Sequence, residues 1–210
     1  TDEKNRPQIL QNLVDDIQGR GNALTAGDVG YRYVLRALEG SGRSDVIYDM
    51  NTRYDVPGYG WMLAHDATAL TESWQAYGSV SNNHFMLGHL MEWLYSGLGG
   101  IRQKNGSAAF RETIIDPQIV GDVTNARTTY ESPYGAIRCE WEKTVNEYRL
   151  KVSVPPNSSA EIAIPTNDAS KVTDYGTPIS YASGISILRN ENGKLWLKVG
   201  SGDYYFKNIY

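Results

Sequence analysis

The chain has 210 residues and a formal net charge of -4, and 40% of its residues are hydrophobic and 21% charged. These values are typical of a globular protein, and the length suits two domains with separate cores. Nucleic acid is excluded as a partner, because it is bound mainly through an excess of Lys and Arg that this chain lacks. The apolar runs are short and interrupted, so none approaches the roughly 20 residues that cross a bilayer, and we expect no membrane segment.

The single cysteine, Cys139, excludes an internal disulfide and a cysteine-cluster zinc site. The chain opens Thr-Asp-Glu-Lys, without a Met or a signal peptide, so we expect any targeting segment to precede it. We expect the intact protein to act outside the cytoplasm, in the periplasm or outside the cell. The 15 Tyr and 5 Trp far outnumber the 3 Phe, and such rings suit either β-strands or contacts with sugars.

Apolar residues at helical spacing predict three helices near the start of the chain. The first begins at Asn5 and ends at Gly19, with a proline where a first turn tolerates it. The second follows Gly30 and ends at Gly40. The third begins at Ser44, a good N-cap.

An irregular stretch rich in Gly, Tyr and Trp follows, over residues 54–80, with a short helix predicted around residues 67–70. Long loops of this kind are often functional. A strong fourth helix is predicted to start at Asn82 or Asn83 and to run to Leu98, with an apolar face broad enough for a buried position.

After Gly99 and Gly100 the hydrophobic period changes to the two-residue alternation of half-buried strands. The alternating segments are 113–115, 136–141, 148–154 and 161–164. Turn signals separate them, as in an antiparallel sandwich. We therefore predict N-terminal α-helical hairpins in a domain of residues 1–103, followed by an antiparallel β-sandwich in residues 104–210.

Phosphate-binding glycine loops, zinc-binding helices and nucleophile elbows are all missing, so we expect neither a cofactor nor a metal site. The irregular stretch and the helix after it gather polar and aromatic residues typical of a carbohydrate site. These residues are Trp61, His65, Asp66, Glu72, Trp74 and His84. Taken singly they are weak signals, since a loop Glu is usually solvated, a His at a helix start can cap or pack, and a Trp is more often core.

Two runs carry a more specific signal: Ala67-Thr68-Ala69-Leu70-Thr71-Glu72-Ser73-Trp74, and Asn82-Asn83-His84-Phe85-Met86-Leu87-Gly88. Further matching runs are 20–30, 42–45, 57–62, 92–95, 130–135 and 154–157. Through them the chain resembles the α-L-rhamnosidases of glycoside hydrolase family 78. The resemblance implies the end of an (α/α)6 catalytic toroid followed by a C-terminal β-sandwich.

The resemblance also implies the roles of two residues. Glu72 takes the place of the family's general base, and His84 that of a residue contacting rhamnose. We expect Trp74 and Tyr59 to be further substrate-binding residues. The implied partner is a rhamnose-containing carbohydrate. The chain departs from the family at Thr71, where Trp is usual, and in a shorter loop between Glu72 and His84.

The family's general acid lies on an upstream Asp-Glu-Arg segment, and this tripeptide does not occur in the 210 residues. An inverting glycosidase needs two carboxyl groups, one to protonate the leaving oxygen and one to activate water. We therefore expect an intact inverting glycosidase that removes terminal α-L-rhamnose, and an inactive chain when these residues stand alone. A toroid cut open also leaves apolar helix faces uncovered, so we expect self-association.

Two other interpretations remain open. The chain could be a non-catalytic carbohydrate-binding module, with Tyr181, Trp196, Tyr204 and Tyr205 as its exposed aromatic strip, although their alternation with apolar residues favours core packing. It could also belong to a toroid glycosidase with another sugar specificity.

Overall fold

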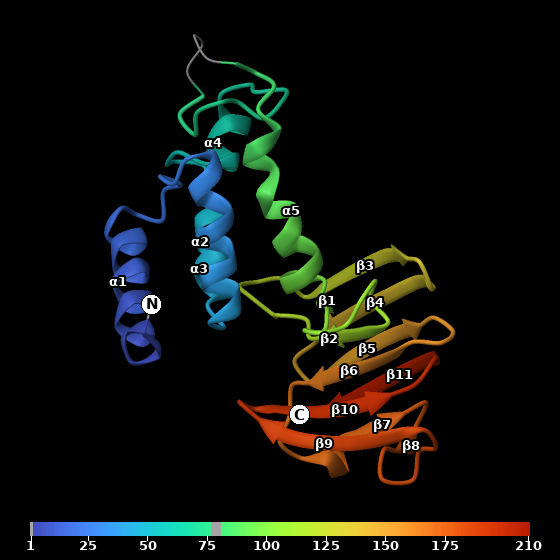
Figure 1. Ribbon diagram of the computed structural model, residues 1–210. Helices are drawn as coiled ribbons and strands as arrows, with labels where there is room; N and C mark the ends of the chain where they lie inside the picture. Colours follow the sequence, from blue (N-terminus) through green and yellow to red (C-terminus); the bar gives the residue numbers. More distant parts are fainter. Residues whose placement is uncertain (1, 77–80) are drawn as a thin grey trace. The chain divides into compact units, whose positions relative to one another are not determined.

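The computed structural model describes residues 2–76 and 81–210. The chain divides into two compact units, residues 1–93 and 94–210, and each is considered by itself (Figure 1). The first is helical and the second is built of strands, so the predicted order of helical hairpins followed by antiparallel sheets is confirmed. The domain boundary that the sequence indicates, after residue 103, lies beyond the point where the compact units divide and stays a prediction.

The helical unit is built on a helical hairpin, α2 followed by α3. Its elements are a 3-10 turn (Glu3–Asn5), α1 (Arg6–Gly19), α2 (Asp28–Gly40), α3 (Ser44–Asn51), α4 (Tyr59–Ala64), a second 3-10 turn (Phe85–His89) and α5 (Leu90–Trp93). Helix α2 buries Tyr31, Leu35 and Leu38, one helical turn apart, and α3 buries its own apolar face. Gly42, at φ 72°, provides the left-handed turn between the two helices.

Two helix predictions in this unit are wrong. The short helix lies at α4 rather than at residues 67–70, because Asp66 takes a left-handed conformation with φ 59° and ends the helix there. The fourth helix is not one continuous α-helix from Asn82 or Asn83. It is a 3-10 turn, then α5, then a π-helical turn (Leu94–Leu98) in which the Gly99 N–H donates to the Leu94 carbonyl at 2.8 Å.

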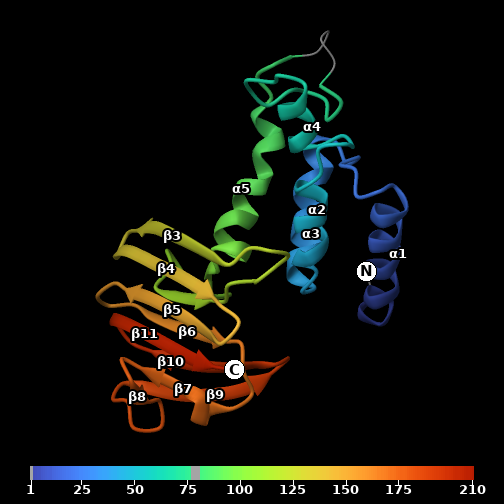
Figure 2. The ribbon, with the colours of Figure 1, turned by 180° about the vertical axis from the view of Figure 1, so that it is seen from behind.

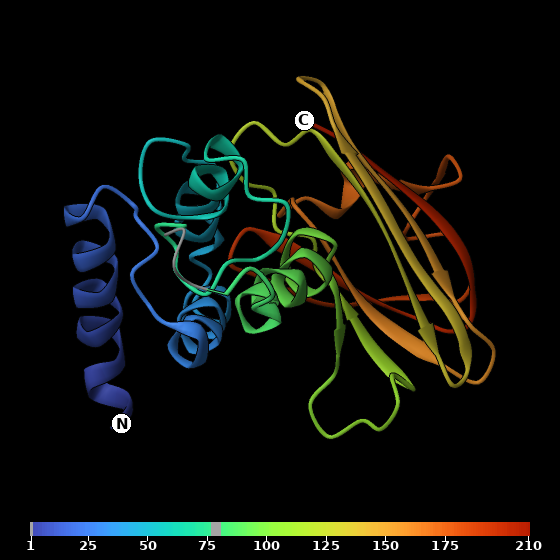
Figure 3. The ribbon, with the colours of Figure 1, turned by 90° about the horizontal axis from the view of Figure 1, so that it is seen from above.

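The second unit is a sandwich of two sheets. Its strands are β1 (Ile101–Gln103), β2 (Glu112–Ile115), β3 (Asn125–Ser132), β4 (Gly135–Lys143), β5 (Glu147–Val154), β6 (Ser159–Ile164), β7 (Val172–Asp174), β8 (Thr177–Pro178), β9 (Ile185–Glu191), β10 (Lys194–Val199) and β11 (Gly202–Ile209), with a 3-10 turn (Ala169–Lys171) before β7. One sheet has the order β1-β2-β6-β10-β9 and the other β3-β4-β5-β11-β7-β8. Figure 2 shows the strands from behind, and Figure 3 shows the long hairpin strands β3, β4 and β5 from above.

Strand pairing departs from the prediction at one place. The sequence predicts an antiparallel sandwich, and the described pairs are antiparallel except β2 with β6, which run parallel. The strands between them in sequence, β3 to β5, belong to the other sheet, so a connection that crosses sheets brings β6 back beside β2.

The core of the sandwich lies between the two sheets. Ile162 and Leu195 from one sheet and Leu150 and Phe206 from the other have no exposed surface. In the second sheet the neighbours of Leu150 and Phe206 along each strand face outward, and most are charged, which is the alternation that the sequence shows. The second sheet therefore presents a charged outer face.

Candidate active site

A cluster of three aromatic rings holds the long loop of the helical unit against α2. The Trp74 ring centroid lies 5.0 Å from that of Tyr31 and 5.2 Å from that of Tyr59. Trp74 is 4% exposed, and its Nε1 donates to the Ala26 carbonyl at 2.7 Å. The Tyr59 hydroxyl donates to the Leu87 carbonyl, and burial raises the pKa of Tyr59 to about 12. Both predicted substrate-binding aromatics thus pack as supports of the loop, and their contact with a sugar stays a prediction.

Trp61 connects α4 to the same loop. Its Nε1 donates to the Gln75 carbonyl at 3.0 Å. The His65 ring stacks on the Trp61 ring at 4.0 Å, and its Nδ1 lies 2.9 Å from the Trp61 carbonyl oxygen. One face of the Trp61 ring is therefore covered, and neither side chain converges on the residues described next.

Glu72 extends from the loop into solvent. Its backbone N–H donates to the Ser81 carbonyl at 2.9 Å, and the Ser81 N–H donates in turn to the Glu72 Oε2 at 3.2 Å. Thr71, the residue before Glu72, is 2% exposed and donates its hydroxyl to the Ser73 carbonyl at 2.6 Å. The backbone around Glu72 is thus held by hydrogen bonds while the side chain remains exposed.

His84 lies at the start of the 3-10 turn before α5, as the sequence suggests. Its backbone N–H donates to the Leu70 carbonyl at 2.8 Å, and its Nε2 lies 3.2 Å from Oδ2 of Asp28 at the start of α2. The other carboxylate oxygen of Asp28 accepts the Val29 N–H at 2.8 Å. The Val29 N–H, and after it His84, hold the pKa of Asp28 below its ordinary value of 3.8.

Asp28 is the residue that the sequence did not single out. An acidic residue at a helix start indicates a cap, and Asp28 does accept a backbone N–H there. Nothing in the spacing shows that the same carboxylate meets an imidazole 56 residues away. The sequence offers one indication that Asp28 belongs to the site, which is its position in the run 20–30 that resembles the family.

Two loop segments bring these side chains together. The bond from His84 to Leu70 and the reciprocal bonds between Glu72 and Ser81 align residues 70–72 with residues 81–84 in antiparallel fashion. The exposed carboxylate of Glu72 and the half-buried imidazole of His84 therefore come from facing segments. Such a pair can remove a proton from water and bind a hydroxyl group.

No metal site and no membrane span are found in residues 2–76 and 81–210. These residues contain no group of three or more His, Cys, Asp or Glu side chains that could hold a metal ion. The helices described are also too short or too polar to cross a membrane.

Helical hairpins with a loop carboxylate, followed along the chain by a β-sandwich, are the features that define the class of protein: a helical-hairpin domain of the glycosidase type with a C-terminal sandwich domain. The family model of the bacterial alpha-L-rhamnosidase 6 hairpin glycosidase domain matches residues 1–98. The model of the bacterial alpha-L-rhamnosidase C-terminal domain matches residues 100–177. The chain belongs to the bacterial α-L-rhamnosidase family and corresponds to its C-terminal portion.

Curated relatives agree with this assignment. An alpha-L-rhamnosidase of Streptomyces avermitilis is 30% identical over 96% of the chain, and one of Formosa agariphila is 27% identical over 99%. The chain spans only 19% and 23% of the length of these two relatives.

Solved structures show the same fold. The S. avermitilis alpha-L-rhamnosidase complexed with L-rhamnose matches with a TM-score of 0.84 and 28% identity, over 94% of this chain and 19% of that one. The enzyme from Dictyoglumus thermophilum matches with a TM-score of 0.84 and 30% identity, over 96% of this chain and 23% of that one.

Proposed function

We propose that the whole protein is an inverting α-L-rhamnosidase that removes terminal α-L-rhamnose from glycans or glycosides. The observation that carries this proposal is the pairing of residues 70–72 with 81–84, which puts the segment with the exposed Glu72 beside the segment with His84, whose Nε2 lies 3.2 Å from Asp28. The activity named for the relatives supports it, since they are alpha-L-rhamnosidases and one was solved with L-rhamnose.

In the proposed mechanism Glu72 is the general base. It takes a proton from a water molecule, whose oxygen forms a bond to the anomeric carbon as the bond to the leaving oxygen breaks. A carboxylic acid outside these 210 residues protonates the leaving oxygen. The water attacks from the face opposite the leaving group, so the anomeric configuration inverts.

The first product distinguishes inversion from retention. We expect proton NMR of an aryl α-L-rhamnoside during hydrolysis by the whole protein to show β-L-rhamnose before mutarotation produces the α-anomer. Initial α-L-rhamnose would contradict inversion, and no release of rhamnose would contradict the activity. The 210-residue chain alone is expected to release none, because it offers Glu72 without the proposed acid.

We further propose that Asp28 orients His84, which binds a rhamnose hydroxyl in ground state and transition state alike. His84→Ala should then raise KM with little change in kcat. Asp28→Asn keeps an oxygen for the Val29 N–H but removes the charge facing His84, so it should raise KM by a smaller factor. If Asp28 acts through His84, the double variant should be no worse than His84→Ala alone. Additive effects on KM would show that the two residues act independently.

We also propose that the 210-residue chain self-associates. Large apolar side chains stay exposed on its helical unit, with Leu63 63%, Phe85 80% and Met91 57% exposed. Multi-angle light scattering should show a mass that rises with concentration, and Phe85→Ser should weaken the rise. A monomeric mass across a wide concentration range would contradict the proposal.

A further inference from the structure

The outer face of the six-stranded sheet carries a groove that the proposed reaction does not use. Two adjoining hollows, of about 310 and 300 Å³, share Glu140, Lys151 and Tyr205. Strand pairing places these three residues in one row with Arg127, across β3, β4, β5 and β11. At a strand spacing of about 4.8 Å the row spans about 14 Å, which is long enough for more than one sugar ring.

One end of the groove carries an aromatic residue in an unfavourable backbone conformation. Tyr175 and Gly176 form the two-residue turn between β7 and β8, with φ 45° and φ 85°. Such turns favour Asn or Asp followed by Gly, because a bulky side chain is disfavoured at positive φ. Tyr175 is also 65% exposed, so burial of its ring does not compensate. A strained and exposed tyrosine indicates a role outside the fold itself.

The Tyr175 ring stands beside a second tyrosine of the groove. The ring centroids of Tyr175 and Tyr205 are 5.9 Å apart at an interplanar angle of 60°, and the Tyr175 N–H donates to the Tyr205 carbonyl at 3.1 Å. Tyr205 faces outward because its neighbours along β11 face the core. Together the rings offer a surface on which the C–H face of a sugar can stack.

The other aromatic residues considered in the sequence as a sugar-binding strip lie elsewhere or are covered. Tyr181 is 83% exposed but lines neither hollow. The Trp196 ring lies under Arg189, whose guanidinium carbon is 4.4 Å from the ring centroid. Tyr204 is partly buried against the core. Tyr205 lines both hollows.

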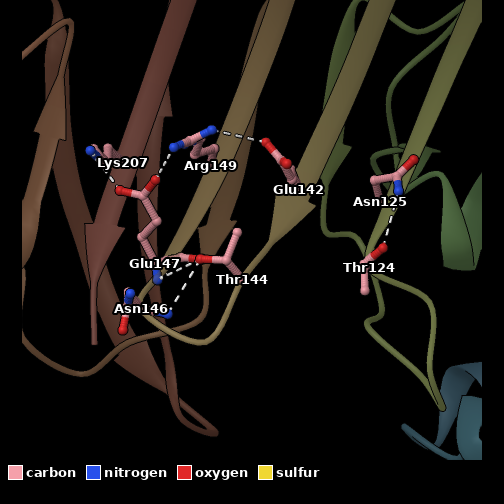
Figure 4. A network of polar contacts seen from close by, with 8 residues as sticks. All are labelled: Thr124, Asn125, Glu142, Thr144, Asn146, Glu147, Arg149 and Lys207. Atoms are coloured by element: carbon pink, nitrogen blue, oxygen red, sulfur yellow. Dashed lines mark hydrogen bonds and ion pairs between the residues drawn. The ribbon is translucent and has the colours of Figure 1, made fainter.

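A second row of charged residues, of which Glu142 and Arg149 also line the groove, has its charges matched within the protein. Figure 4 shows Glu147 between Arg149 and Lys207, with Arg149 reaching on to Glu142. The Lys207 Nζ lies 2.6 Å from the Glu147 carboxylate, and the Arg149 Nη1 lies 3.1 Å from that of Glu142. The charges of these side chains are therefore balanced without a ligand.

Two cations inside the groove lack such partners. Neither Arg138 nor Lys151 makes an ion pair with another described residue, whereas Arg127 is held 3.1 Å from Glu140. The Lys151 ammonium lies instead 5.8 Å from the centroid of the Tyr205 ring. Asp203, whose carboxylate accepts the Ser153 hydroxyl at 2.6 Å, also lines the groove. The lining then has four cations and three carboxylates, and this excess of positive charge favours a ligand that brings negative charge.

We propose that this groove binds an oligosaccharide that carries negative charge on carboxylate or sulfate groups. Tyr175 and Tyr205 stack on a sugar ring, and Lys151 and Arg138 pair with the acidic groups. The backbone strain at Tyr175 is the observation that separates this site from an ordinary solvated sheet face. The site is independent of Glu72 and gives the sandwich a binding function of its own.

Isothermal titration calorimetry with the 210-residue chain tests the proposal. The probes are tetramers of galacturonic acid, of a sulfated galactose and of neutral galactose. We expect at least one acidic tetramer to bind with a Kd below about 1 mM, more weakly as salt is raised, and the neutral one to bind at least about tenfold more weakly. Binding of the sulfated tetramer alone, or of the galacturonate alone, identifies the negative group. Failure of both acidic probes, or equal binding of the neutral one, overturns the proposal.

Two variants distinguish an effect on ligand binding from an effect on folding stability. Tyr175→Asn relieves the strained turn, so it should raise the midpoint of thermal unfolding while it weakens binding by about tenfold. Lys151→Gln should weaken binding and reduce its salt dependence. Tyr181→Ala and Lys198→Gln remove an exposed ring and an exposed cation outside the groove and should leave binding unchanged. Unchanged affinity in Tyr175→Asn would overturn the proposal.

Discussion

Glu72→Gln in the whole protein is expected to lower turnover of an aryl α-L-rhamnoside by about 10²–10⁴-fold, with little change in substrate affinity. Glutamine keeps the shape of the side chain and an oxygen for the Ser81 N–H, which Glu72 accepts at 3.2 Å. The variant therefore removes proton acceptance and leaves the loop in place. Steady-state kinetics with kcat and KM determined separately provide the measurement.

The matched control is Glu3→Gln, which changes an 87% exposed carboxylate in the same helical unit and should leave turnover unchanged. Added azide provides a second check, since a small anion can attack from the face that water uses. Rescue of Glu72→Gln by azide should yield β-L-rhamnosyl azide, opposite to the substrate's anomer. Near-normal turnover in Glu72→Gln would show that the base lies elsewhere.

The sequence predicts the helical half well where apolar spacing alone decides the structure. Helices α1 to α3 begin and end close to the predicted residues, and α3 starts at Ser44, although its N-cap is Arg43 and not Ser44 as expected. The prediction is wrong after residue 54, because there the backbone depends on contacts that periodicity does not contain. The left-handed Asp66 ends α4, and the Gly99-to-Leu94 bond widens the last helical turn into a π-helix.

In the sandwich, the two-residue period identifies the strands but not their partners. The segment containing β6 shows the same alternation whether it pairs with a parallel or an antiparallel neighbour, so the parallel β2–β6 pair was not predictable. The same limit applies to the site. The family resemblance, not the residue pattern, pointed to Glu72 and His84, and the Asp28 contact spans 56 residues that no local pattern links.

A buried carboxylate links β1, at the edge of the first sheet, to β10. Asp116 is 5% exposed, and its Oδ2 accepts Arg102 of β1 at 2.9 Å while its Oδ1 accepts Lys194 of β10 at 2.5 Å. Its backbone N–H donates to the Gly100 carbonyl at 2.8 Å. One side chain thus connects β1 with β10, whose Lys194 lies 78 residues after Asp116.

Asp116→Ala is expected to destabilise the chain by about 2–3 kcal/mol, because it removes the buried carboxylate that both cations share. The loss is smaller than the about 3–5 kcal/mol of a fully buried pair, since the Arg102 and Lys194 side chains are each 30% exposed and recover some hydration. Thermal and urea unfolding of the 210-residue chain, followed by circular dichroism of the β-rich unit, provide the measurement.

The control for Asp116→Ala is Glu191→Ala, which breaks a surface pair with Arg189 in the same sheet. That carboxylate is 55% exposed, so its loss should change stability by less than about 0.5 kcal/mol. Asp116→Asn should fall between the two, because the amide keeps one acceptor for Arg102 but loses the charge that both cations share. Equal midpoints for Asp116→Ala and Glu191→Ala would show that the sandwich does not depend on this link. Packing between the two sheets would then be sufficient to hold β1 and β10 in place.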